Sequence, residues 1–83
     1  MSGVDQRVLR TAAAAYAAAR SEYEAAKTAA DQAYERLQAS PDTIEYQIDW
    51  NITRREEAAA AWRVQEAQAR YRAAGGYVRD SDE

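Results

Sequence analysis

Large apolar side chains and alanines alternate along the first half of the chain with a seven-residue period. One series, at strict intervals of seven, comprises Leu9, Tyr16, Tyr23, Ala30 and Leu37. The second series follows three residues later and comprises Ala12, Ala19, Ala26 and Ala33. This is the a/d spacing of a coiled coil, in which both series lie along one side of a helix. The pattern predicts a long helix with a narrow apolar seam, where alanine allows a neighbouring helix to approach closely.

Two short segments interrupt the periodicity. The segment "QASPDT" (38–43) contains the only proline, and we expect Ser40 to cap a second helix that has Pro41 at its first position. Gly75 suits the left-handed residue that commonly ends a helix. The predicted boundaries are a helix over about 5–38, a turn at 39–41, a helix over about 42–74 and an acidic tail at 77–83.

These elements predict an all-α protein with one domain spanning residues 1–83. Two helices of similar length joined by a short turn form an antiparallel hairpin. We therefore expect an alanine-rich coiled-coil hairpin, which would be half of a four-helix bundle if the chain dimerises.

The second helix has apolar residues on two opposite sides. We assign the side with the larger aliphatic residues to the intramolecular seam. The seam would then consist of Leu9, Tyr16, Tyr23 and Leu37 from the first helix and Ile44, Ile48, Ile52 and Trp62 from the second. Residues whose numbers sum to about 81 would lie opposite each other. Arg55 and Glu66 fall on the same side, where they either extend to the edge with their charges in water or form a buried pair.

The other side of the second helix would then be left for another molecule. It comprises Tyr46, Trp50, Thr53, Ala60, Val64, Ala67 and Tyr71. A continuous stripe of aromatic and apolar residues on a surface is typical of a protein–protein interface. The sequence therefore predicts a protein-binding stripe on the second helix.

The amino-acid composition argues against catalysis and against metal binding. The chain has no Cys and no His, which removes thiolate sites, the commonest general base and the commonest metal ligand. The carboxylates lie on polar sides of the helices, and a hairpin offers no cleft to perturb them. We expect no enzymatic activity, no cofactor and no metal.

The charge and hydropathy of the chain argue against nucleic acids and membranes as partners. Arginines near Tyr71 and Tyr77 are interrupted by acidic residues, and the net charge of −3 argues against nucleic-acid binding. No apolar run reaches the length of a membrane span, and no signal peptide is evident. We expect no membrane contact and a location in the cytoplasm or within a virion.

In size and hairpin design the chain resembles the WxG-type helical hairpins exported by type VII secretion, which dimerise into four-helix bundles. The turn sequence "QASPDT" lacks their Trp-x-Gly motif, and Tyr77 is followed four residues later by Ser81 rather than by an acidic residue. A plasmid-control bundle or a virion accessory subunit would have the same shape.

The function expected from the sequence is that of a bacterial or phage protein without catalytic activity. It would self-associate, or serve as a subunit of a larger assembly, through the aromatic stripe on the second helix. The alternative is a small inhibitor or adaptor that docks the same stripe onto a host or cellular enzyme.

Overall fold

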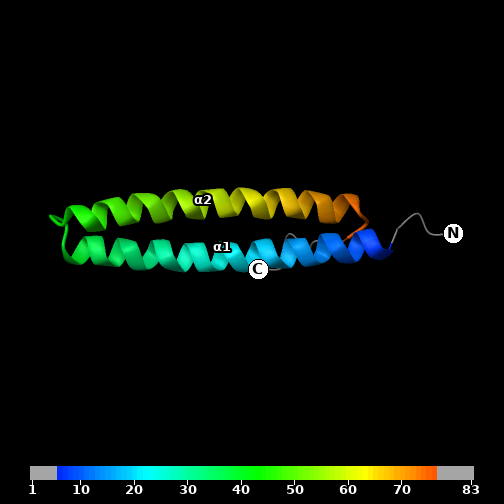
Figure 1. The fold of residues 1–83 in the computed structure, drawn as a ribbon, viewed down its shortest axis with the longest axis horizontal. Helices are drawn as coiled ribbons and strands as arrows, with labels where there is room; N and C mark the ends of the chain where they lie inside the picture. Colours follow the sequence, from blue (N-terminus) through cyan, green and yellow to red (C-terminus); the bar gives the residue numbers. More distant parts are fainter. Residues whose placement is uncertain (1–5, 77–83) are drawn as a thin grey trace.

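The chain folds into two antiparallel helices that lie side by side along their length (Figure 1). The computed structural model describes residues 6–76 and contains α1 (Gln6–Ala39) and α2 (Ile44–Ala73). At 1.5 Å per residue, α1 with its 34 residues is about 51 Å long and α2 with its 30 residues is about 45 Å long. The predicted all-α hairpin is confirmed, and each observed helix boundary lies within two residues of its expected position. The predicted acidic tail, 77–83, lies outside the described residues.

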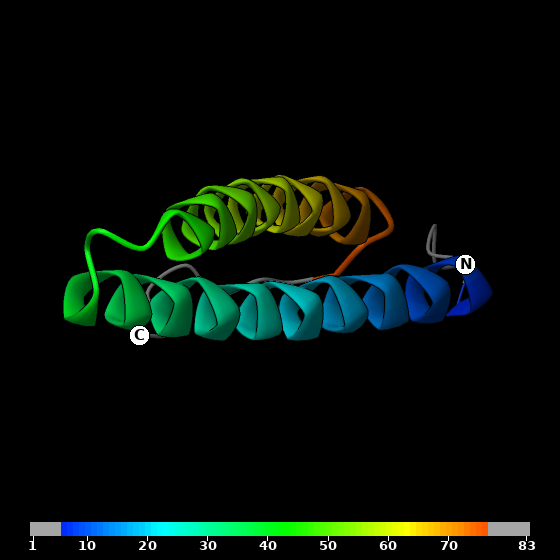
Figure 2. The ribbon, with the colours of Figure 1, turned by 60° about the vertical axis from the view of Figure 1, so that its left-hand side comes forward.

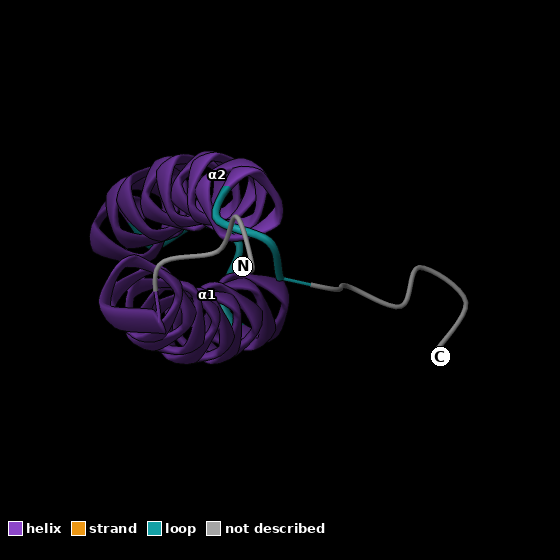
Figure 3. Ribbon diagram, turned by 90° about the vertical axis from the view of Figure 1, so that its right-hand side faces the viewer, coloured by secondary structure: helices purple, strands orange, loops and turns teal. Residues whose placement is uncertain are grey.

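The seven-residue pattern of α1 lies against α2, as the sequence predicts. Leu9, Tyr16, Tyr23 and Leu37 are half-buried, and Ala19, Ala30 and Ala33 are buried. Seen from the side and from the end, α2 covers one side of α1 and leaves the other side open (Figures 2 and 3). The seam on α1 is therefore confirmed.

The connection between the helices is a β-turn, so α2 begins later than predicted. The backbone N–H of Thr43 donates to the carbonyl of Ser40 at 3.1 Å, which closes a turn with Pro41 and Asp42 at its centre. Thr43, not Ser40, is the N-cap residue, and Ile44 is the first helical residue. The prediction that Pro41 starts the helix was wrong because the fixed φ of proline suits the second position of a β-turn equally well.

The carboxyl end of α2 has the predicted glycine cap. Gly75 has a φ of 102°, and its N–H donates to the Arg72 carbonyl at 3.0 Å. The N–H of Gly76 donates to the Tyr71 carbonyl at 2.8 Å, which completes a Schellman motif. Gly76 also lies against the Tyr71 ring so closely that a Cβ at this position would overlap it.

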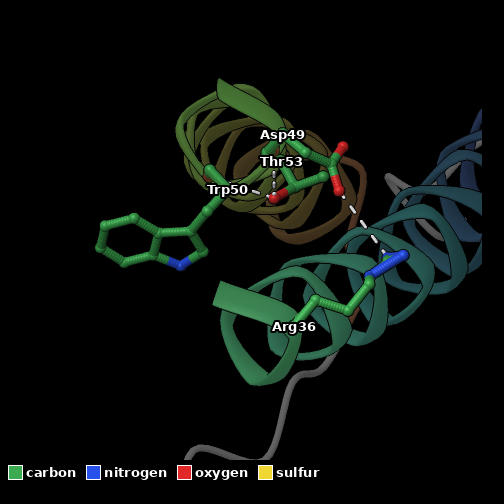
Figure 4. Close-up of polar contacts among 4 residues, drawn as sticks. All are labelled: Arg36, Asp49, Trp50 and Thr53. Carbon is green, nitrogen blue, oxygen red and sulfur yellow. Dashed lines mark hydrogen bonds and ion pairs between the residues drawn. The ribbon is translucent and has the colours of Figure 1, made fainter. Parts of the chain in front are cut away.

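Small residues make the core. The buried hydrophobic residues of the described chain are all alanines, and the best buried are Ala33 and Ala60, each 1% exposed. Thr53 is also buried, and its hydroxyl donates to the backbone carbonyls of Asp49 at 2.9 Å and Trp50 at 3.1 Å (Figure 4). Alanine contributes little area, and the free energy of burial scales with apolar area, so this core stabilises the hairpin only modestly.

Candidate interaction surface

The side of α2 that contacts α1, here called the inner face, is the side that was predicted from the sequence to bind another protein. Its buried or half-buried members include Tyr46, Trp50, Thr53, Ala60, Val64, Ala67 and Tyr71. Tyr71 stacks on Tyr16 of α1 with ring centroids 5.7 Å apart and an angle of 17° between the rings. The prediction that this stripe binds another protein was therefore wrong, because α1 already covers it.

Aromatic packing continues toward the turn. Tyr34 of α1 lies against Trp50 of α2 with ring centroids 5.4 Å apart. The guanidinium of Arg54 lies over the Trp50 ring, 5.1 Å from its centre. Trp50, Tyr34 and Arg54 line a shallow, open groove together with Ala30, Asp31 and Glu57.

Two interhelical ion pairs show how the helices are aligned. Arg36 lies 3.7 Å from Asp49 (Figure 4), and Arg63 lies 3.6 Å from Glu22. All four side chains are about half exposed, so each pair contributes little stability. These pairs place α2 about one helical turn away from the predicted alignment, because the β-turn takes up residues that were expected to be helical.

The opposite side of α2, here called the outer face, is exposed. Its four large apolar residues are Ile44, Ile48, Ile52 and Trp62, which are 65%, 53%, 49% and 62% exposed, respectively. These residues were predicted to pack against α1, and that prediction was wrong. Within the described chain, the other large hydrophobic residues that are exposed are Val8 and Tyr34 of α1. The outer face of α2 therefore holds most of the exposed bulky apolar residues of the hairpin.

The inner-face residues of α2 have the spacing of a coiled-coil seam. From Tyr46 to Tyr71, inner-face residues alternate intervals of four and three without interruption, which matches the seam of α1. Ile44, Ile48 and Ile52 follow one another at intervals of four residues. Each side chain is therefore rotated by about 40° around the helix from the one before it. The inner-face series contains one charged residue, Glu57, whereas the series on the opposite side that starts at Ile48 contains two, Arg55 and Glu66. Aliphatic content alone therefore does not identify the inner face. The same inner-face spacing includes Glu57, a half-buried inner-face residue that was not among those predicted from the sequence.

A second regular series is nevertheless present on the outer face. It starts at Ile48, alternates intervals of four and three to the end of α2, and is exposed throughout. We call it the outer row; it comprises Ile48, Ile52, Arg55, Ala59, Trp62, Glu66, Ala69 and Ala73. Arg55 and Glu66 are its charged members, and within residues 6–76 neither has an ion-pair or hydrogen-bond partner.

Among the described residues, no group of three or more acidic side chains is placed to hold a metal ion. Every buried side-chain nitrogen and oxygen in the same part of the chain has a hydrogen-bond partner. Neither α1 nor α2 has the apolar length needed to cross a membrane. The outer face of α2 is thus the most distinctive surface feature of the hairpin.

Comparison with known proteins adds no relative. No protein-family model, curated protein or solved structure matches the chain. The function is therefore inferred from the outer face of α2 itself.

Proposed function

We propose that this protein is a non-enzymatic interaction protein that binds another protein chain through the outer face of α2. The partner is first of all a second copy, which makes the hairpin a self-associating module or a subunit of a larger assembly. The face differs from the one expected from the sequence, but the kind of function is the same.

One observation supports the proposal: four large apolar side chains lie exposed along one side of a single helix. Ile44, Ile48, Ile52 and Trp62 are each about half exposed or more. Full burial of such a side chain stabilises a protein by about 1.5–3 kcal/mol. Small domains are stable by only about 5–15 kcal/mol in total, so covering this face would be a large gain for a hairpin with an alanine core.

The first test measures the mass of the purified chain by light scattering over a range of concentrations. We expect the native protein to be at least dimeric and a Trp62→Glu variant to be monomeric at the same concentration. The matched control is Ala14→Glu, which introduces the same charge on the exposed side of α1 and should leave the mass unchanged. Circular dichroism should show similar helicity in all three proteins, because neither side chain packs between the helices.

A monomeric native chain at every concentration would overturn self-association. A native dimer that Trp62→Glu leaves intact would overturn the assignment to the outer face. The inhibitor or adaptor alternative predicts a monomer that gains stability only in the presence of a defined target protein.

A further inference from the structure

The outer row of α2 is complementary to itself when two copies run in opposite directions. Its eight residues follow the a/d spacing of a coiled coil over residues 48–73. We propose that the partner of this row is the outer row of a second copy, related by a two-fold axis that passes near the middle of α2, between residues 60 and 61. This proposal rests on the proposed function and specifies its geometry.

In this arrangement every large apolar residue of the outer row meets an alanine. Position numbers that sum to 121 lie opposite each other, so Trp62 of each copy faces Ala59 of the other. Ile52 faces Ala69, and Ile48 faces Ala73 in the same way. Because a two-fold axis repeats each contact, the six apolar positions of each row fill one another without leaving two bulky side chains in the same layer.

The charges agree with the same alignment. Arg55 of each copy lies opposite Glu66 of the other, which gives two ion pairs placed symmetrically about the axis. Both side chains are exposed in the hairpin, and neither has another partner among residues 6–76. Within one helix they are eleven residues apart, or about 16 Å, so they cannot pair with each other in the same chain.

Other alignments of the two rows are less favourable. A parallel pair in register would place Arg55 against Arg55 and Glu66 against Glu66, and like charges repel. An antiparallel pair shifted by seven residues in one direction would place Glu66 against Ile48, and a shift in the other direction would place it against Trp62. The charges therefore select one antiparallel alignment from those that the apolar residues alone would permit.

A charge-exchange experiment tests this alignment on the full chain. Arg55→Glu places carboxylates opposite each other at both pairs, and Glu66→Arg does the same with guanidinium groups. We expect each single variant to dimerise about tenfold more weakly than the native chain at low ionic strength. The controls Arg10→Glu and Glu35→Arg carry the same changes in net charge on the exposed side of α1 and should dimerise as the native chain does.

Mixing the two single variants provides the decisive measurement. In a mixed dimer, Arg55→Glu in one copy faces Glu66→Arg in the other, and both opposing pairs are again opposite in charge. We expect the mixture to form heterodimers with nearly native affinity, measured by sedimentation equilibrium or by fluorescence transfer between labelled copies. The double variant R55E/E66R should likewise recover self-association.

The outcomes separate this inference from the function on which it rests. If the native chain dimerises through Trp62 but the mixed variants show no recovery, the two-fold alignment is wrong and the interaction surface still stands. If the native chain does not dimerise at all, both fail. Circular dichroism on each single variant identifies any loss of dimer that comes from an unfolded helix, and the mixture remains informative because it uses the same two chains.

Discussion

Two tryptophans on the same helix show how strongly the surroundings of a residue decide its role. Trp50 is half-buried on the inner face, where Tyr34 and Arg54 pack against its ring. Trp62 is 62% exposed on the outer face. Both are large amphipathic residues of the kind enriched at binding hot spots, so residue type does not distinguish them. Only their positions relative to α1 distinguish them, since one contacts α1 and the other is exposed.

This difference predicts opposite behaviour for two matched variants. Trp50→Ala should lower the free energy of unfolding by about 2 kcal/mol, because it removes aromatic packing between the helices. Trp62→Ala should lower it by no more than about 0.5 kcal/mol when the protein is dilute, as is usual for exposed residues. Urea unfolding followed by circular dichroism at low micromolar concentration would measure both. Equal losses in the two variants would mean that the faces of α2 are not distinguished as described.

At the scale of the helices, much of the fold could be predicted because it depends on periodicity. The seam of α1 follows from one unbroken seven-residue pattern, and Gly75 follows from the backbone conformation that a helix end requires. The seam of α2 could not be assigned from apolar content alone, because both of its faces are apolar and the isoleucines lie on the outer one. The start of α2 was missed because proline fits both a first helical turn and a β-turn. The contacts with α1 decide the first point, and the hydrogen bond from the Thr43 N–H to the Ser40 carbonyl decides the second.

Close approach of the helices depends on alanine at the buried positions. Ala33 is 1% exposed, so Ala33→Leu should force the helices apart and lower the free energy of unfolding by about 1–3 kcal/mol. Ala25→Leu adds the same side chain to an exposed position of α1 and should change stability by less than about 0.5 kcal/mol. Thermal unfolding of the two variants beside the native chain would test this. A similar midpoint for both variants would show that the gap between the helices tolerates a larger side chain.

At the scale of the whole molecule, the two faces of α2 determine the shape of any assembly. The outer row is offset by two residues from the inner-face series, which corresponds to about 200° around the helix. A helix that packs through two nearly opposite faces has one neighbouring helix on each side, so the three helix axes lie in one plane. Pairing through the outer row would therefore produce four helices side by side in the order α1, α2, α2, α1. A closed four-helix bundle, as expected from the sequence, would need the two faces to be about 90° apart.

These two shapes differ in their radius of gyration, which small-angle X-ray scattering measures directly. With packed helices about 8–10 Å apart, we expect dimerisation in a row to increase the radius of gyration by about 2–3 Å, whereas a closed bundle would increase it by less than about 1 Å. The Trp62→Glu variant supplies the monomer reference under the same conditions, so segments outside the helices contribute equally to both measurements. An increase below 1 Å in a confirmed dimer would mean that α1 and α2 both contact the second copy, and the outer row of α2 would not be the sole dimer interface.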